Sequence, residues 1–423
     1  MTRGAGGCPP AGARRGHGLS GRAGAGGGAR APGEYTRADG RPVGERGGSR
    51  GRGPIECACA AGGAGPASAR RRTPALTLTR PIEQLDRFGP DADRSAPPPS
   101  PDEARRYVRA LAGRRYENFS VLSSLVPERL RDDFAAVYAF CRWSDDLGDE
   151  TGSTVTARAR SIELLDWWRS ELESCFAAAL PERYGGPSGS AAGGEPPPEV
   201  RHPVFVALAD VIRRRDLPDR PFHDLIDAFV QDQHLLRYQT WEQLIDYSSR
   251  SANPVGRLVL MLGGYSLDEP EHEHLFAMSD ATCTALQLTN FWQDARRDLL
   301  ERDRVYLPLS EMGLTEAQLR DWLHRPNDAA ARVPFIRALR PLCERTRQLY
   351  ETGKPLPAAL NNELSPVVWL FWAGGRSVLR SIDRIGCATL WERPTLSRVK
   401  KASLVAAASV RFRLHRERGC PAA

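Results

Sequence analysis

From about residue 100 onward, apolar residues recur three and four positions apart in segment after segment. Residues at this spacing share one face of an α-helix, whereas a half-buried strand alternates apolar and polar residues. No sustained alternation occurs in this part of the chain. The predicted fold class is therefore all-α. The predicted helices run over 102–113, 128–148, 156–179, 203–215, 221–236, 254–265, 270–300, 315–324, 330–352, 365–390 and 396–414.

Two stretches interrupt this helical pattern. The segment 181–203 contains the run GGPSGSAAGGEPPP, and so many glycines and prolines favour a flexible surface loop inserted within one domain. Residues 1–80 hold 21 of the 39 glycines and almost no apolar run longer than two. Such a segment buries too little to offset the entropy of ordering it. We therefore expect a disordered tail at 1–97, rich in Arg, Gly and Pro, and a catalytic domain at 98–418.

The charge of the chain is concentrated in that tail. Its first 80 residues carry 14 arginines, no lysine and four acidic residues, so they contribute +10 to a chain whose net charge is +7. The remainder is therefore at −3, which argues against nucleic-acid binding by the folded part. The tail itself can bind RNA or anionic lipid, but a solvated tail and an over-long start of translation explain it as well. We assign it no function.

Targeting and redox signals are weak. No apolar core of seven or more residues follows the first arginines, and no long uncharged run could span a membrane, so a cytoplasmic protein is expected. The nine cysteines are scattered and are expected to be reduced thiols. The segment 398–418 places cations beside apolar residues, which suits either a membrane surface or, as we prefer, closure of the helical bundle. Peripheral contact with the inner face of a membrane remains an expectation.

A first polar stripe lies in AAVYAFCRWSDDLGDE. Tyr138, Arg142, Asp145 and Asp149 follow one another at intervals of four, three and four residues, so they share one face of a helix whose other positions are mostly apolar. Buried carboxylates without partners are costly, so this stripe is expected to face a polar cavity. Taken alone, the motif also fits a frayed, solvated helix end at Gly148.

A second stripe lies in ALQLTNFWQDARRDLLERDRVYLP. Gln287, Asn290, Asp294 and Asp298 step by three, four and four along another helix. Two facing helices with carboxylates one turn apart can hold hard divalent cations, and such cations bind phosphate oxygens. A di-iron bundle is disfavoured, because the one Glu-x-x-His motif, at 271–274, has no mate. A nicotinamide site is also not expected, since the glycine fingerprint at 16–21 has no flanking strand or helix.

A third segment, QDQHLLRYQTWEQLIDYSSRSANPVG, mixes polar and aromatic residues with small ones. The small residues Ser251, Ala252 and Gly256 suit either the approach of a bulky apolar ligand or close packing of a second helix. Spacing alone leaves both interpretations open. The polar and aromatic residues of this segment are Asp232, Arg237, Tyr238, Tyr247 and Asn253.

Together, the three segments resemble the squalene and phytoene synthase family over roughly residues 100–415. The two aspartate motifs of that family correspond here to DDLGD at 145–149 and NFWQDARRD at 290–298. The resemblance implies an isoprenoid-synthase-type helical bundle around a deep central cavity. The Mg²⁺ ligands that it implies are Asp145, Asp149, Asn290, Asp294 and Asp298. The residues expected to act in catalysis are Tyr138, Arg142 and Tyr247, and those expected to bind substrate are Phe119, Arg142, Tyr238, Asn253 and Arg304.

Within that family, ENFSV at 117–121 and FCRWSDDLGDE at 140–150 are most similar to the hydroxysqualene synthase branch. The resemblance implies that presqualene diphosphate is converted to hydroxysqualene, with release of diphosphate and without nicotinamide. The sequence departs from the usual second motif at Arg297, where an acid commonly precedes the last Asp. Three alternatives remain: a head-to-head synthase that joins two farnesyl or geranylgeranyl diphosphates, a non-catalytic family member that binds or assembles, and a nucleic-acid binder that uses the tail. The sequence predicts no oligomeric state.

The chemistry implied by this resemblance divides the site in two. Diphosphate leaves only if its developing charge is neutralised, which metal ions and Arg142 would do. The hydrocarbon cation needs apolar walls with aromatic faces. Arg302, Arg304 and Tyr306 are expected on a loop that closes over the diphosphate, although a solvated charge run explains them nearly as well. The candidates for the aromatic walls are Phe119, Tyr138, Tyr247, Phe291 and Trp292, of which only some should touch ligand.

Overall fold

The computed structural model describes residues 80–114, 125–184 and 199–417. The chain divides into two units after Arg72, and all described residues belong to the second unit. These residues form helices and no strand, so the predicted all-α class is confirmed. A parallel β-bridge of one residue pair joins Arg237 to Val305. No helix in the described ranges is both long and apolar enough to cross a bilayer.

The helices follow the predicted order with small shifts at their ends. The longer ones are α2 (Pro101–Arg114), α4 (Arg131–Asp149), α5 (Val155–Ala179), α7 (Pro203–Arg215), α8 (Arg220–His234), α9 (Trp241–Ser251), α10 (Asn253–Leu262), α11 (Glu273–Glu301), α14 (Ala329–Gly353), α16 (Ser365–Arg384) and α17 (Arg398–Glu417). The shorter ones are η1 (Pro81–Gln84), α1 (Leu85–Phe88), η2 (Glu128–Leu130), α6 (Pro181–Tyr184), η3 (Pro270–His272), α12 (Leu309–Met312), α13 (Glu316–Trp322) and α15 (Leu356–Ala359).

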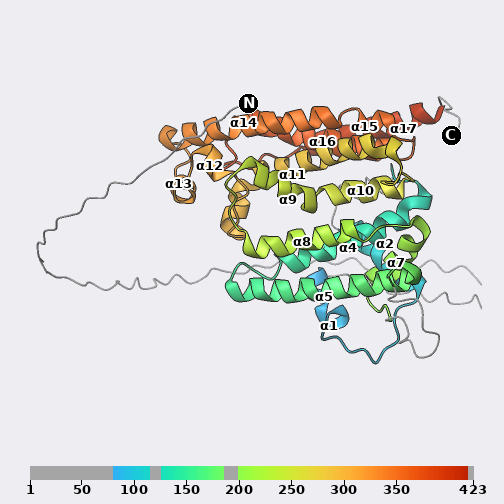
Figure 1. Cartoon of the computed structure of the whole chain (residues 1–423). Coiled ribbons are helices and arrows are strands. Elements are labelled where there is room, and N and C mark those ends of the chain that lie inside the picture. The colour runs from blue at the N-terminus through green and yellow to red at the C-terminus, as the bar shows by residue number, and fades with distance from the viewer. Residues whose placement is uncertain (1–79, 115–124, 185–198, 418–423) are drawn as a thin grey trace, which may run out of the picture. The chain divides into compact units, whose positions relative to one another are not determined.

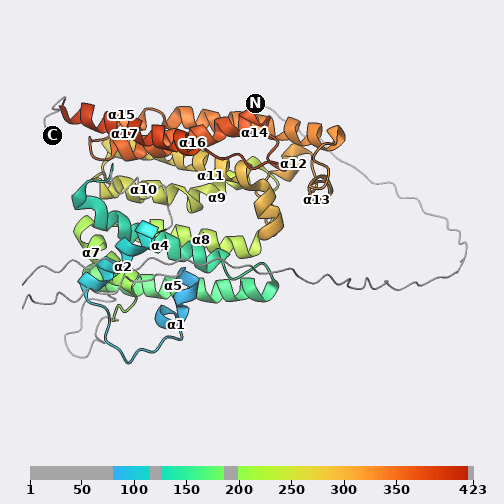
Figure 2. The same cartoon turned by 180° about the vertical axis from the view of Figure 1, so that it is seen from behind.

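The long helices of this unit stack in layers (Figures 1 and 2). The helices α14 and α16 cover α11, and α17 packs on α16. Next come α9 and α10, which contact both α11 and α8. The helices α4 and α8 follow, with α5 and α7 on their far side. The two helices that carry the predicted carboxylates, α4 and α11, therefore lie on opposite sides of the middle of the stack.

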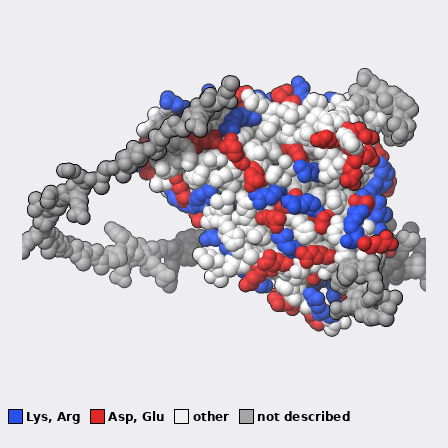
Figure 3. Space-filling model, in the orientation of Figure 1, with Lys and Arg blue, Asp and Glu red and all other residues white. Residues whose placement is uncertain are grey.

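Buried apolar side chains form two clusters. The first joins α2, α4, α5 and α7, and it contains Phe140, Trp143 and Trp168. The second joins α9, α11, α14 and α16, and it contains Trp292 and Phe335. Because α4 belongs to the first cluster and the C-terminal half of α11 to the second, the polar stripes of these helices lie where the two clusters meet. Acidic and basic side chains are interspersed on the visible outer surface (Figure 3).

The predicted domain start at 98 is too late. Residues 81–88, assigned to the disordered tail, form η1 and α1 and pack on the domain. At the start of η1, the Glu83 side chain accepts hydrogen bonds from the Arg80 backbone N–H at 3.1 Å and from Arg80 Nε at 2.8 Å. The Gln84 side chain accepts a hydrogen bond from the Tyr107 hydroxyl at 3.0 Å, and the Phe88 ring lies edge-on to the Tyr107 ring. Composition missed this segment because it is short and is separated from the first long helix by a stretch rich in proline.

Three local predictions also need correction. The helix α9 was not predicted, although Thr240 and Gln243 cap its start reciprocally in the usual Thr-x-x-Gln pattern. The predicted loop at 181–203 begins with the short helix α6, where Pro181 is tolerated because a first-turn residue needs no N–H partner. The last predicted residues of 365–390 are not helical, since α16 ends at Arg384 and both Gly386 and Cys387 have positive φ.

Candidate active site

The polar stripe of α4 is oriented by the packing of the opposite helix face. The Trp143 ring stacks on Trp168 of α5, with centroids 5.4 Å apart, and its Nε1 donates a hydrogen bond to the Tyr107 hydroxyl at 3.0 Å. Trp168 in turn donates to the Ser144 hydroxyl at 3.0 Å. These buried contacts fix the rotation of α4 about its axis, so Arg142 and Asp145 point away from the first apolar cluster.

Arg142 is held by two carboxylates of its own helix. It pairs with Asp145 at 2.7 Å and also with Asp146, which is fully buried. The sequence motif contained Asp146 but gave it no role, because it lies off the stripe. In the structure Asp146 fixes the position of the guanidinium, so it positions Arg142 and does not itself face the site.

The end of α4 is joined to α8 and to the loop after α11. A Cβ atom on Gly148 would lie 3.2 Å from the Phe229 ring of α8, so glycine permits this close approach. The Gly148 carbonyl accepts a hydrogen bond from the Gln233 side chain at 3.0 Å. Gly148 is thus a packing residue inside the helix, and the frayed helix end that the sequence also allowed is not found. The next residue, Asp149, is held by Arg304 at 2.5 Å.

The second stripe lies on α11. Asp294 and Asp298 are buried, whereas Asn290, one turn earlier, is exposed. Arg297, the residue that departs from the usual motif, pairs with Asp294 at 2.8 Å and lies 3.7 Å from Asp298. It therefore neutralises this stripe. Arg393, in the segment before α17, also pairs with Asp294. Sequence analysis missed Arg393, which follows its partner by 99 residues.

One guanidinium connects the two stripes. Arg302, in the loop after α11, pairs with Asp149 of α4 at 2.9 Å and with Asp298 of α11 at 3.4 Å. The two carboxylates, from helices on opposite sides of the stack, are therefore separated by about the width of one side-chain cation. The structure thus brings the predicted acidic motifs together.

A buried hydrogen-bond network lies beside this bridge. The Tyr247 hydroxyl of α9 donates to Asp232 of α8 at 2.6 Å, and Arg304 lies 3.7 Å from the same carboxylate. Tyr306 also hydrogen-bonds Asp232. Because Arg304 contacts both Asp149 and Asp232, it joins this network to the first stripe. Sequence analysis had noted Asp232 without assigning it to the site.

The aromatic residues predicted as walls separate into two groups. The Tyr306 ring stacks on Phe291, with centroids 4.2 Å apart, and contacts Tyr238 and Tyr247. These four rings form one cluster next to Asp232. Trp292 lies elsewhere: it is fully buried, and its Nε1 donates to Thr346 of α14 at 2.9 Å. It is a core residue and does not line the site.

The remaining predicted residues have mixed outcomes. Tyr138 lies on the α4 stripe and is partly buried. The Tyr238 hydroxyl accepts a hydrogen bond from Gln231, and its ring belongs to the aromatic cluster. Asn253 accepts a hydrogen bond from Thr284 at 2.9 Å, which ties α10 to α11. Phe119 lies outside the described residues. The deep central cavity implied by the resemblance stays a prediction.

Three carboxylates of the site have raised pKa values. Burial and then the charge of Asp149 raise the pKa of Asp145 to about 7. Burial raises the pKa of Asp298 to about 6, against the opposing effect of Arg302 and Arg297. Burial also raises the pKa of Asp232 to about 6, although Arg304 opposes the shift. Carboxylates in this state favour any additional positive charge that enters.

The donor set fits a hard divalent cation. Its carboxylates and the exposed amide of Asn290 supply oxygen ligands, and the ligands come from both sides of the bridge. In the described residues no three Asp, Glu, His or Cys side chains converge on one point, because guanidinium groups stand between the carboxylates. Binding of a cation therefore requires that Arg302 or Arg393 turn away.

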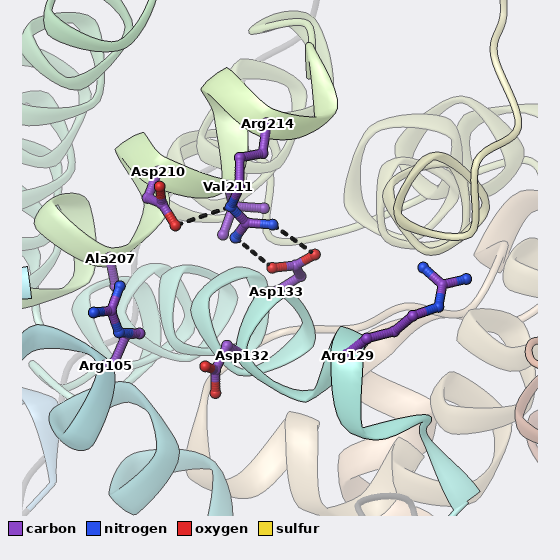
Figure 4. A pocket seen from close by; sticks show the side chains of 8 residues that line it. All are labelled: Arg105, Arg129, Asp132, Asp133, Ala207, Asp210, Val211 and Arg214. Carbon is purple, nitrogen blue, oxygen red and sulfur yellow. Dashed lines mark hydrogen bonds and ion pairs between the residues drawn. The ribbon is translucent and has the colours of Figure 1, made fainter. Parts of the chain in front are cut away.

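Apart from this site, a charged pocket of about 270 Å³ lies between α2, α4 and α7 (Figure 4). Its carboxylate Asp133 is buried and pairs with Arg214 at 2.7 Å and with Arg215 at 2.8 Å. Arg214 also pairs with Asp210, as Figure 4 shows. These opposite charges satisfy one another, so the pocket is a structural ion-pair cluster and we assign it no ligand.

Comparisons with known proteins agree with the fold and with the motifs. The sequence profile of the Squalene/phytoene synthase family matches residues 112–400. The hydroxysqualene synthase of Rhodopseudomonas palustris is 32% identical over 255 residues, which is 60% of this chain and 75% of that protein. The phytoene synthase of Arthrospira platensis is 27% identical over 330 residues, or 75% and 96% of the two chains. The crystal structure of squalene synthase HpnC from Alicyclobacillus acidocaldarius superposes with a TM-score of 0.55 at 35% identity and covers 68% of this chain and 95% of that one.

Proposed function

Because this chain belongs to the squalene/phytoene synthase family, and is thus an enzyme of the isoprenoid prenyltransferase type, we propose that it converts presqualene diphosphate to hydroxysqualene. The proposed reaction consumes one water molecule and releases diphosphate. The similarity to hydroxysqualene synthases supports this choice of reaction.

The bridge between the two stripes supports this proposal most directly. Arg302 contacts Asp149 and Asp298 at once, so anionic groups of two helices share one cationic position. A position of this kind suits Mg²⁺, which neutralises the diphosphate when it is bound. The residues that would hold it are Asp145, Asp149, Asn290, Asp294 and Asp298.

The arginines of the site would act on the leaving group. Arg142, Arg302 and Arg304 converge from α4 and from the loop after α11, and each is now held by an aspartate. Released from these pairs, they can donate to diphosphate oxygens as the carbon–oxygen bond breaks and the diphosphate takes the electron pair. Donors that are already positioned stabilise the developing charge without further reorganisation at that moment.

The hydrocarbon cation that remains needs a different environment. Tyr247, Phe291 and Tyr306 place aromatic rings next to the charged groups, and an aromatic face is worth roughly a kcal/mol or more to a cation in a dry site. After rearrangement, water forms the new carbon–oxygen bond and loses a proton. Asp232 is a suitable acceptor for that proton, since burial raises its pKa to about 6.

A condensing enzyme is the second candidate. The similarity to phytoene synthases, which extends over more of the chain, favours it. Such an enzyme would join two farnesyl or geranylgeranyl diphosphates head to head and would use the same charged groups for the first departure of diphosphate.

The test is an assay of the purified protein with Mg²⁺ and, separately, presqualene, farnesyl and geranylgeranyl diphosphates, with the extracted lipids analysed by mass. Repeating the assay in H₂¹⁸O should label the product hydroxyl if water quenches the cation. Asp145→Asn and Asp294→Asn should each lower kcat by at least about 100-fold. Asp132→Asn is the matched control, because Asp132 lies on α4 but pairs with Arg109 at the other end of the helix.

The outcomes separate the candidates. Labelled hydroxysqualene from presqualene diphosphate, lost in both site variants and retained in the control, would support the proposed reaction. A product from farnesyl or geranylgeranyl diphosphate would favour the condensing enzyme. Absence of product from all three substrates would contradict both.

A further inference from the structure

The helix α17 has an apolar face on each of two sides. Leu404 and Ala408 are buried against α16, as expected for a helix that closes a bundle. On the outer side, Val399 is 79% exposed and Val410 is 55% exposed. These valines are eleven residues apart, which is about three helical turns, so they lie on one line along the helix. Ala402 and Ala406, both exposed, lie on the same line.

Cations flank this outer stripe, and acids are absent from its sequence. Arg398, Lys400 and Arg411 are exposed on α17. The sequence contains no Asp or Glu from 393 to 416. An exposed apolar stripe bordered by cations is typical of a helix that lies in the plane of a membrane surface. Closure of the bundle uses the opposite face of α17 and does not bury the outer valines.

A groove beside the stripe strengthens this interpretation. It has a volume of about 300 Å³ and lies between α16 and α17, and Trp369, Arg380 and Lys400 are among the residues that line it. The guanidinium of Arg411 lies 5.7 Å from the centroid of the Trp369 ring. Aromatic rings beside cations suit the headgroup layer of a bilayer, where one side is apolar and the other is wet.

We propose that α17 and the adjoining groove dock this enzyme on the surface of an anionic lipid bilayer. The stripe from Val399 to Val410 enters the headgroup layer, and the groove accepts one lipid phosphate at Arg380 and Lys400. Each cation near such a surface adds roughly 1 kcal/mol of attraction. The choice of a lipid partner rests on the proposed function, because the reactant and the product of that reaction are long hydrocarbons.

The test is binding of the full chain, without substrate, to sedimenting vesicles of phosphatidylcholine with and without phosphatidylglycerol. The double variant Val399→Asp/Val410→Asp should weaken binding to the anionic vesicles by at least about tenfold, since it removes apolar contact and adds repulsion. Val333→Asp is the matched control, because Val333 is 51% exposed on α14. Arg380→Gln/Lys400→Gln should weaken binding to anionic vesicles and leave the binding to pure phosphatidylcholine unchanged.

Hydrogen exchange separates α17 from the arginine-rich N-terminal segment. Anionic vesicles should slow amide exchange in 398–411 of the wild type by at least about tenfold and should not do so in the valine double variant. Equal vesicle binding by the double variant and by the control would overturn the proposal, as would slowed exchange of this segment with RNA but not with vesicles. Turnover of detergent-dispersed substrate should be the same in the double variant as in wild type, so loss of docking and loss of the proposed reaction are distinguishable.

Discussion

Arg302 is a residue whose contacts define the site. It pairs with carboxylates of α4 and of α11, although α4 and the C-terminal half of α11 belong to different apolar clusters. Asp149 and Asp298 would otherwise face each other as like charges in a partly buried space, which is unfavourable. Arg302 therefore stabilises the metal-free protein, and Mg²⁺ should be able to take over this role.

We predict that Arg302→Met lowers the melting temperature in EDTA by a few degrees, since a partly exposed pair of this kind contributes about 1–2 kcal/mol. Millimolar Mg²⁺ should raise the melting temperature of this variant more than that of wild type, because the cation restores the missing charge. Differential scanning fluorimetry with and without Mg²⁺ measures both effects. Arg345→Met, which removes a surface pair with Glu311, is the control. If Mg²⁺ raised the melting temperature of the variant and of wild type by the same amount, the result would contradict the proposed metal site.

The ionisation of Asp232 makes the stability of the folded protein depend on pH. Its pKa is raised from 3.8 to about 6, so the folded state holds this proton more tightly than the unfolded state does. Ionisation of Asp232 therefore costs stability as pH rises through this interval, and the cost is complete once the pH has passed the folded-state pKa. Tyr247 and Arg304, which contact the carboxylate, reduce the cost without removing it.

We predict that the difference in unfolding free energy between Asp232→Asn and wild type shifts in favour of the variant as pH rises from about 4 to about 7. The shift is at most about 3 kcal/mol, because one pKa unit corresponds to about 1.4 kcal/mol. Urea unfolding in EDTA at several pH values measures it. Asp246→Asn, which removes a carboxylate from an exposed pair on α9, is the control, and the change for Asp232→Asn should exceed that of the control. A difference between Asp232→Asn and wild type that stays constant with pH would refute the prediction.

At the scale of elements, the close packing of α10 against α11 bears on the small residues at 251–256, for which the sequence allowed either a bulky ligand or a second helix. A Cβ atom on Gly256 would lie 2.5 Å from Ser279 Oγ and 2.5 Å from Cys283 Sγ of α11. This contact supports close helix packing as the reason for a small residue at 256. The same approach brings Asn253 within hydrogen-bond distance of Thr284, so it sets the position of α11 relative to α9 and α10.

Gly256→Ala should therefore lower the free energy of unfolding by about 1–3 kcal/mol, because the added methyl group overpacks the contact. Gly374→Ala on α16 should have the opposite sign, since a Cβ atom there would meet nothing within 4 Å and alanine favours helix by up to about 1 kcal/mol. Chemical denaturation of both variants measures the two changes in the free energy of unfolding. Stabilisation by both substitutions would show that α10 and α11 are farther apart than these contacts indicate.

The local nature of sequence patterns explains which elements of this fold could be predicted. Periodicity predicted the long helices and both carboxylate stripes, because apolar spacing and four-residue steps are local properties. It missed α9, whose capping box was readable in TWEQ. It also missed Arg393 and left Asp232 without a role, since their partners Asp294 and Arg304 are far away along the chain. Contacts of that kind depend on how helices stack, which no local pattern encodes.

At the scale of the whole molecule, residues 80–88 at the start of the described chain pack on the domain. Arg80 pairs with Glu150, the residue that follows α4, at 2.5 Å. The Phe88 ring lies edge-on to both Tyr107 and His202, with centroid separations of 5.4 and 5.5 Å. These contacts support the outer side of α4, and they belong to a segment that composition alone assigns to the tail.

Two truncations test this packing. Removal of residues 1–79 should leave the melting temperature and the activity unchanged, because this segment is rich in Gly and Arg and has almost no apolar runs to bury. Removal of residues 1–97 should lower the melting temperature by about 5 °C, since the contacts of Arg80, Gln84 and Phe88 are lost. Thermal unfolding of the two proteins in parallel provides the comparison. Equal melting temperatures would mean that residues 80–97 add nothing to the fold.

Because the arginines of the site are paired with aspartates, the binding of a metal ion and of diphosphate is an exchange of ionic partners. A divalent cation that enters must displace Arg302 or Arg393 from an aspartate, and a diphosphate that enters needs those same guanidinium groups. Either ion alone must therefore break pairs at a cost in free energy, whereas both together exchange partners. Linkage requires that each then strengthens the binding of the other by the same factor. We expect such heterotropic cooperativity between Mg²⁺ and inorganic diphosphate, and with it a resting enzyme that binds neither ion tightly on its own.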